Sequence, residues 1–206
     1  KAAFPVDIRS TEATFDIQYG NVKRPTHWNT SWEMAKFETV GHQWADLSET
    51  GYGVSLLNDC KYGYDIKGNT LRLSLLKSSV YPDTEADQGE HVFTYSLYPH
   101  IGDWREGKTH QEAWTLNAPV EVFDGVLTSH KGSLLSSDHH HIHIDAVKKA
   151  EEADGIIVRL HEFEGRKGEV TLHTDFAWDY WQETDLMEVP LSDKMESSTI
   201  TLDVSP

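Results

Sequence analysis

The sequence predicts an all-β protein, and three observations lead to that prediction. Apolar and polar residues alternate along many short segments, clusters of Gly, Asp and Asn separate those segments, and apolar residues at helical spacing are scarce. Successive side chains of a strand point to opposite faces of its sheet, so alternation is typical of strands with one buried face. Gly, Asp and Asn tolerate the backbone conformations of turns, so their clusters indicate where strands end.

The alternation is clearest in residues 11–20, where Ala13, Phe15, Ile17 and Tyr19 are separated by polar or small residues. The same pattern predicts further strands at residues 70–77, 91–98, 155–163, 169–176 and 198–204. Turn residues gather at 64–69, 123–125 and 164–168.

One segment is compatible with a helix as well as with a hairpin. Ile144, Val147 and Ala150 have helical spacing, with Gly155 as a possible end of the helix. Residues 151–155, however, end in Asp-Gly directly before a strong strand pattern, which is a good turn signal. We therefore favour a hairpin over a helix here.

The charge balance excludes several classes of partner. The 206 residues contain 18 Lys and Arg against 34 Asp and Glu, a net charge of −16 with neutral His. A surface this acidic repels phosphate backbones and anionic lipid, so we expect no nucleic acid and no membrane partner. The single cysteine, Cys60, cannot form an internal disulfide, and the first residues lack the apolar segment of a secretory signal. We expect a cytoplasmic location.

A histidine cluster at residues 138–145 is the first candidate for chemistry. On a strand, His139, His141 and His143 would share one face, and imidazoles are good zinc or nickel ligands. Side chains on one strand face lie about 6–7 Å apart, so a closed site would need a fourth group from a neighbouring strand. We expect a solvated strand face that takes up metal only opportunistically.

Three other patterns are weaker evidence for a functional site. Residues 83–89 are similar to the start of a calcium loop, but the Gly falls one place late and Thr94 stands where the closing Glu should be, so we expect a turn. Cys60 has no evident base, which favours a structural role. Asp46 and Glu49 form an acidic pair, yet sequence does not show whether two carboxylates lie close enough for glycoside hydrolysis.

Residues 27–64 interleave aromatic side chains with planar polar ones. Trp28, Trp32, Trp44, Tyr52, Tyr62 and Tyr64 alternate there with His, Asn, Gln, Asp and Lys. Flat rings stack on the apolar faces of sugars while amides and carboxylates bond their hydroxyls, so the mixture suits a carbohydrate cleft. The alternative is that the aromatic residues fill the core of a β-sandwich.

Long ordered strings of residues resemble the C-terminal β region of glycoside hydrolase family 38 α-mannosidases. The strongest run from His42 to Tyr64, which contains Leu-Leu-Asn-Asp-Cys-Lys-Tyr-Gly-Tyr, and from Ala86 to His100; residues 24–32, 68–76, 146–151 and 155–162 add to the resemblance. The resemblance implies a galactose mutarotase-like β-supersandwich at 1–130 and a smaller C-terminal β-sandwich at 131–206.

The family consists of retaining, zinc-dependent exo-α-mannosidases, which hydrolyse terminal α-mannosyl residues of oligosaccharides. Its zinc ligands and nucleophile belong to a large amino-terminal domain, so the resemblance implies that this chain is a carboxy-terminal piece of a longer enzyme. We expect no catalytic residue and no cofactor in the chain, with zinc in the amino-terminal domain. That domain and mannose-containing oligosaccharides are the expected partners, and unpaired sheet edges favour a homo-oligomer.

The resemblance also implies a sugar-lining segment. The family's equivalent of residues 56–62 approaches the catalytic domain, so Asn58, Asp59, Lys61, Tyr62 and Tyr64 are expected to line the cleft. Several relatives have Arg directly after the Asp, whereas this chain has Cys60 followed by Lys61. The structural alternative is a turn formed by the Asn58 and Asp59 side chains, with the tyrosines packed inside.

Two other functions stay open at this point. One is a stand-alone carbohydrate-binding module that uses exposed aromatic residues, among them Trp44. The other is a metal-binding protein that acts through His139, His141 and His143.

Overall fold

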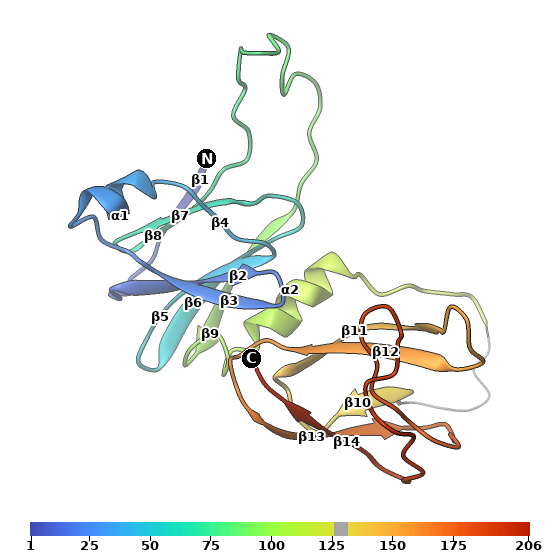
Figure 1. Cartoon of the computed structure of the whole chain (residues 1–206). Helices are drawn as coiled ribbons and strands as arrows, with labels where there is room; N and C mark the ends of the chain where they lie inside the picture. Colours follow the sequence, from blue (N-terminus) through green and yellow to red (C-terminus); the bar gives the residue numbers. More distant parts are fainter. Residues whose placement is uncertain (126–131) are drawn as a thin grey trace. The chain divides into compact units, whose positions relative to one another are not determined.

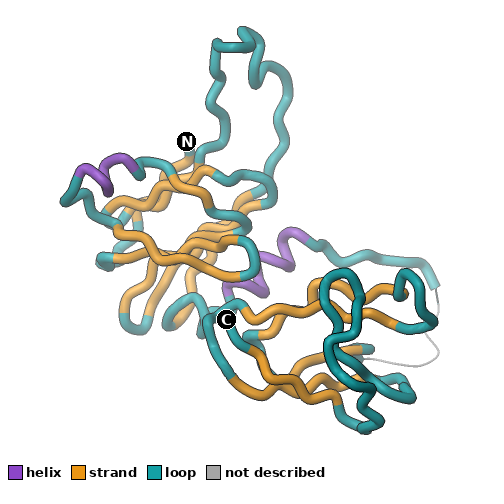
Figure 2. Tube along the Cα trace, viewed as in Figure 1, coloured by secondary structure: helices purple, strands orange, loops and turns teal. Residues whose placement is uncertain are grey.

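The computed structural model describes residues 1–125 and 132–206, which form two compact units, residues 1–123 and 124–206 (Figure 1). The domain boundary expected between 130 and 131 falls outside the described residues. Strands dominate both units, and the described part contains two short helices, α1 (Ser31–Ala35) and α2 (Thr109–Asn117) (Figure 2). The prediction of an all-β fold is therefore confirmed.

Unit 1 contains two antiparallel sheets. The four-stranded sheet has the order β1 (Ala2–Pro5), β8 (Thr70–Leu73), β7 (Gly63–Lys67), β4 (Thr39–Val40). The five-stranded sheet has the order β3 (Gly20–Pro25), β2 (Glu12–Ile17), β5 (Trp44–Glu49), β6 (Tyr52–Asn58), β9 (Tyr95–Ile101).

The hydrophobic core of unit 1 lies between these two sheets. One cluster of buried side chains joins them: Ala13, Phe15, Ala45, Leu47, Val54 and Leu56 come from the five-stranded sheet, and Tyr64, Ile66, Leu71 and Leu73 come from the four-stranded one. Each set follows the two-residue period of a strand, and the alternation in the sequence predicted two of these strands, β2 and β8. Phe15 meets Tyr64 across the layer in an edge-to-face contact with ring centroids 6.3 Å apart.

A buried polar network crosses the five-stranded sheet. The Asp46 carboxylate accepts hydrogen bonds from Ser48 and from Ser55 Oγ (2.8 Å), and lies 2.8 Å from His100 Nε2. Ser55 Oγ also lies 2.7 Å from Thr109 Oγ1, at the start of α2. Burial lowers the pKa of His100, but the hydrogen bond and charge of Asp46 outweigh it and leave the pKa raised.

Gly53 makes room for the imidazole of this network. It stands directly opposite His100 in the β6–β9 ladder, and a Cβ at Gly53 would lie 2.2 Å from His100 Cε1. No side chain fits at that distance, so glycine is required if the ring is to reach Asp46.

Helix α2 lies along β6 because both of its ends are bonded to that strand. Thr109 contacts Ser55 at its first turn, and Asn117 Nδ2 donates to the Asn58 carbonyl (3.1 Å) at its last. Eight residues of helix advance about 12 Å, and three residues of strand advance about 10 Å, so the two spacings match. The helix thus fixes the end of β6, where the expected sugar-lining segment begins.

Unit 2 contains a hairpin and a three-stranded sheet. The hairpin is formed by β11 (Ile142–Lys149) and β12 (Ile156–Glu162), with a bulge between Ile144 and Ala146. The sheet has the order β10 (Leu135–Ser137), β13 (Gly168–Thr174), β14 (Ile200–Val204). Among the described residues of unit 2, the buried apolar side chains are those of Ile142, Phe163, Val170 and Leu172. The hairpin predicted in place of a helix is confirmed.

Several elements differ from the sequence prediction. The strand predicted at 70–77 ends at Leu73. The strand predicted at 91–98 begins only at Tyr95, and residues 74–94 contain neither strand nor helix. Helix α2 was not predicted, because its preceding residue Lys108 has a left-handed backbone (φ 54°) and provides no side-chain cap. Helix α1 carries a local sequence signal that alternation does not contain, since Thr30 and Glu33 form a capping box.

Asp16 makes the stability of unit 1 depend on pH. Burial raises its pKa to about 7, against the opposing hydrogen bond from the Gln43 N–H. The unfolded pKa is about 3.9, so this contribution to stability is present in full below about pH 4 and is lost as pH rises through 7. We expect Asp16→Asn to match wild type near pH 4 and to exceed its free energy of unfolding by about 4 kcal/mol at pH 8.

Urea denaturation at the two pH values measures this difference, because other titrating groups are common to both proteins. Asp7→Asn, at an exposed position, is the matched control and should follow wild type. Equal pH dependence of wild type and Asp16→Asn would contradict the prediction.

Candidate functional site

The segment that connects β6 to β7 begins with a buried asparagine. Asn58 Oδ1 accepts hydrogen bonds from the Cys60 N–H (3.0 Å) and from the Lys61 N–H, which bends the chain sharply after the strand. Its Nδ2 donates to the His42 carbonyl (3.0 Å) and to the Tyr64 hydroxyl. Because both its amide oxygen and its amide nitrogen form hydrogen bonds, Asn58 fixes the shape of the loop from its buried side.

Tyr64 is fully buried as well. Its ring belongs to the core of unit 1 and its hydroxyl lies within reach of the Leu56 carbonyl (3.4 Å). Burial raises the pKa of Tyr64 far above that of a free tyrosine, so the phenol is neutral. Asn58 and Tyr64 were expected to line a cleft, but the structure places both under the surface. Their positions agree with the structural alternative, in which Asn58 forms a turn and Tyr64 packs in the core.

Asp59, Lys61 and Tyr62 remain at the surface of the same loop. Asp59 Oδ2 accepts a hydrogen bond from the Thr94 N–H (2.9 Å), and its own N–H donates to the Thr94 carbonyl (3.1 Å). Burial would raise the pKa of Asp59, but hydrogen bonds from Cys60 and Thr94 outweigh it and hold the pKa below its usual range. Asp59 is therefore a fixed, ionised carboxylate.

The neighbouring cation and ring are also held in place. Lys61 Nζ lies 4.8 Å from the centroid of the Phe93 ring, a cation–π contact. Tyr62 is exposed and meets His42 edge to face, with centroids 5.6 Å apart. A carboxylate, an ammonium and an exposed aromatic ring thus occupy four successive residues.

Cys60, between them, is a weak nucleophile. Its hydrogen bond to Asp59 and its partial burial raise the pKa of the thiol, against the smaller effect of Lys61. A raised pKa keeps the thiol protonated, and thiolate is the reactive form. The structural interpretation of Cys60 fits these contacts.

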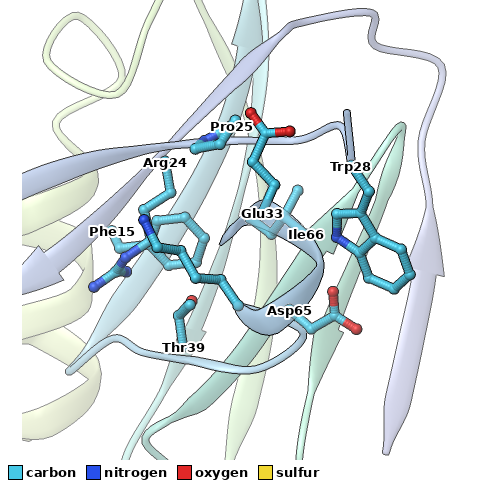
Figure 3. A pocket seen from close by; sticks show the side chains of 9 residues that line it. Phe15, Arg24, Pro25, Trp28, Glu33, Thr39, Asp65 and Ile66 are labelled. Carbon is cyan, nitrogen blue, oxygen red and sulfur yellow. The ribbon is translucent and has the colours of Figure 1, made fainter. Parts of the chain in front are cut away.

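A pocket lies between α1 and the strands β2, β3, β4 and β7 (Figure 3). Its polar groups already bond within the protein: Arg24 Nη1 donates to the Val40 carbonyl (2.7 Å), Asp65 pairs with Arg72 (2.9 Å), and Glu33 caps α1. Its volume of about 20 Å³ holds little more than one water molecule. A sugar ring does not fit there.

The aromatic residues predicted for a sugar cleft do not share one environment. Trp44 is buried and stacks on Trp104, with ring centroids 4.9 Å apart. Lys67 Nζ covers the face of Trp28 at 3.1 Å from its centroid, whereas Trp32 on α1 is exposed. Trp44 therefore packs in the interior and is no exposed platform, which removes the main residue of the stand-alone binding module.

The histidine cluster divides between a turn and a strand. Strand β11 begins only at Ile142, so His139 and His141 precede it, with their rings 5.0 Å apart, while His143 faces His161 across the hairpin. His161 Nδ1 lies 2.9 Å from Asp145, and His140 lies 3.3 Å from the buried Glu164. Over residues 1–125 and 132–206, no three His, Cys, Asp or Glu side chains converge as metal ligands.

Residues 83–89 form a turn in which acidic side chains cap backbone N–H groups. Asp83 accepts from the Glu85 N–H (2.9 Å), and Asp87 accepts from the N–H groups of Lys77 (3.2 Å) and Ser78 (2.8 Å). These bonds lower the pKa of Asp87. The carboxylates thus bind the chain itself.

Comparison with known proteins identifies the family. The family described as "Glycosyl hydrolases family 38 C-terminal domain" matches residues 1–85, and "Glycosyl hydrolases family 38 C-terminal beta sandwich domain" matches residues 141–206. The chain belongs to the C-terminal region of glycosyl hydrolase family 38. The first match includes the whole Asn58–Tyr64 loop, and the second includes β11 to β14 of unit 2.

Curated relatives in family 38 are similar in sequence but much longer. Alpha-mannosidase G of Dictyostelium discoideum is 44% identical over 160 residues, which is 75% of this chain and 15% of that protein. Human Alpha-mannosidase 2C1 is 40% identical over 195 residues, which is 92% of this chain and 19% of that protein. The chain thus spans less than a fifth of the length of these relatives.

A solved structure shares the fold. The crystal structure of an alpha-mannosidase from Enterococcus faecalis V583 matches 94% of this chain with a TM-score of 0.75, at 22% identity and over 23% of that chain. At this identity the likeness supports the family 38 fold alone. In the described residues of the chain, no helix is both long and apolar enough to cross a membrane.

We expect the Asn58 side chain to stabilise unit 1, whereas the surface side chains of Lys61 and Tyr62 should contribute little to its stability. Asn58→Ala removes the partner of the Cys60 and Lys61 N–H groups and one of the partners of the Tyr64 hydroxyl, so we expect the free energy of unfolding to fall by about 2–4 kcal/mol. Lys61→Ala and Tyr62→Ala, at the surface, should change it by less than about 1 kcal/mol. Urea denaturation of the three variants measures this, and a stable Asn58→Ala variant would contradict it.

Proposed function

We propose that this chain is the non-catalytic C-terminal β region of a longer α-mannosidase, which hydrolyses terminal α-mannosyl residues of oligosaccharides. The observation that carries the proposal is the pair of family 38 C-terminal matches together with relatives named α-mannosidases that are about five times as long. The proposal includes a retaining mechanism and zinc bound in the amino-terminal portion, which is the expected partner of this chain.

The chemistry of retaining hydrolysis supports this division. It requires two carboxyl groups about 5 Å apart on either side of the glycosidic bond, and a metal site needs three or more converging ligands. Within residues 1–125 and 132–206 no such ligand group exists, so the residues of this chain do not fit the zinc. We assign the metal, and with it the nucleophile, to the amino-terminal portion, as the family resemblance implies.

The surface of the β6–β7 loop supplies what the wall of a sugar cleft needs. Ionised Asp59 accepts hydrogen bonds from hydroxyl groups, Lys61 donates to them, and the exposed ring of Tyr62 offers a flat apolar face. All three lie on a loop whose shape Asn58 fixes from inside, so they are preorganised for a ligand. We propose Asp59, Lys61 and Tyr62 as the sugar-lining residues.

We also propose a cellular location and an oligomeric state for the enzyme. The single cysteine suits a reducing compartment, so we place the enzyme in the cytoplasm. Strands β3 and β9 are the edges of the five-stranded sheet, and pairing of such edges between copies would give a homo-oligomer.

Hydrolysis of a chromogenic α-mannoside tests the division of labour. We expect no turnover by the 206-residue chain, with or without added zinc or cobalt, because the reacting carboxylates lie elsewhere. In the longer polypeptide that contains this chain, we expect turnover, and Lys61→Ala and Asp59→Asn should lower kcat/KM by about 10-fold or more.

Lys23→Ala is the matched control, since Lys23 is an exposed lysine on β3 that pairs only with Glu12 at 3.4 Å among the described contacts. It should leave kcat/KM unchanged. Metal-dependent turnover by the purified 206-residue chain would refute the division of labour, and unchanged kinetics in Lys61→Ala and Asp59→Asn would refute the cleft assignment.

A further inference from the structure

Residues 76–93, here called the arm, form a long surface segment of unit 1 that the proposed cleft residues do not explain. The arm leaves β8, extends away from both sheets and returns to β9 without any helix or strand (Figure 1). Irregular loops of this length are uncommon in compact domains, and those that are ordered usually serve a function.

The arm is ordered by its own hydrogen bonds. Asp87 on the returning leg accepts from the N–H groups of Lys77 and Ser78 on the outgoing leg, at 3.2 and 2.8 Å. His91 Nε2 lies 2.9 Å from the Asp87 carbonyl, which adds a contact within the returning leg. The two legs are thus cross-linked, and the arm has a defined shape before it meets any partner.

Large apolar side chains of the arm face solvent. Val80, Tyr81 and Val92 are 74%, 86% and 87% exposed, whereas the Asp87 carboxylate is bonded to the backbone of the arm itself. Several large apolar side chains this exposed on one ordered segment indicate an interaction site. An ordered segment with its apolar side chains outward is preorganised to bury them against another surface.

The charge of the arm narrows the choice of partner. Four carboxylates, those of Asp83, Glu85, Asp87 and Glu90, stand against one lysine. Two arms face to face would bring eight carboxylates together, and an anionic membrane would be repelled likewise. The fitting partner surface is an apolar recess with a basic rim.

The root of the arm is continuous with the proposed cleft residues. Thr94, directly after the arm, exchanges two hydrogen bonds with Asp59, and Phe93 at its end lies under Lys61. A body that meets the root of the arm therefore also lies next to Asp59 and Lys61. More than four fifths of the length of the curated relatives lies outside the part that this chain matches, so such a body exists in them.

We propose that the arm docks into a basic-rimmed apolar recess on the amino-terminal portion of the longer polypeptide, and so positions the Asp59–Tyr62 loop against the catalytic centre. The inference rests on the proposed function, because it takes the longer polypeptide from it. Because the arm and its recess belong to one polypeptide, their effective concentration is high, so three apolar side chains are enough to keep the arm bound.

Cleavage by a glutamate-specific protease tests the docking, since Glu85 and Glu90 lie in the arm. We expect rapid cleavage at these residues in the 206-residue chain and cleavage at least 10-fold slower in the longer polypeptide. The triple change Val80→Asp, Tyr81→Ser, Val92→Asp should restore rapid cleavage of the longer polypeptide and lower kcat/KM for an α-mannoside. Val120→Asp, at a valine of equal exposure outside the arm, should do neither.

Three other outcomes would each overturn either the docking or the proposed function. Equal cleavage rates in the short and long chains would overturn the docking, as would protection of the short chain that grows with its concentration, because the arm would then be covered by a second copy. An arm that is protected in a long polypeptide without α-mannosidase activity would leave the docking in place and refute the proposed function.

Discussion

The buried Asp46 carboxylate is the constraint on which the arrangement of unit 1 depends. A charge in the interior is strongly unfavourable unless donors surround it, and Asp46 takes its donors from β5, β6 and β9 at once. Ser55 stands directly opposite Asp46 in the ladder, and a shift of one residue would place an apolar side chain there. The network therefore reinforces the register of three strands that apolar packing also favours. Through Ser55 and Thr109 it also places α2 along β6, so the position of the β6–β7 loop depends on the Asp46 charge of β5, which lies opposite Ser55 on β6.

The loop itself combines structural and chemical residues in one short run. Asn58 points inward and satisfies four polar groups, while Asp59, Lys61 and Tyr62 point outward over it. The change of direction at Asn58 comes from a side chain that imitates a backbone turn, which is a property of asparagine. Because the inward residue fixes the outward ones, the loop presents its polar groups with little conformational entropy left to lose on binding.

The sequence predicted much of the fold because alternation is a local signal. The strands at 11–20 and 155–163 and the hairpin at 151–155 depend on neighbouring residues, and the structure contains β2, β12 and the turn between β11 and β12 at these places. The Asp46–His100 pair joins residues 54 apart, and no local pattern indicates it. The same limit applies to Trp44 and Tyr64: alternation places each on one face of a strand, but which face is covered depends on the second sheet. Asn58 was named as a candidate because the family's equivalent segment approaches the catalytic domain, and its burial follows from partners at His42 and Tyr64 that only the fold brings together.

The contrast between loop and arm explains how one module can serve both folding and docking. Side chains such as those of Asn58, beneath the loop, and Asp87, between the legs of the arm, satisfy polar groups of the fold, and the residues beside them are free to meet other surfaces. The exposed valines and tyrosine of the arm contribute nothing to the core of unit 1, so they add no stability to the isolated unit and only increase its tendency to associate. Such residues are favourable only where another surface covers them for most of the protein's lifetime. The acidic residues around them oppose the most available wrong partner, a second copy of the same arm, and thereby restrict the arm to a basic surface.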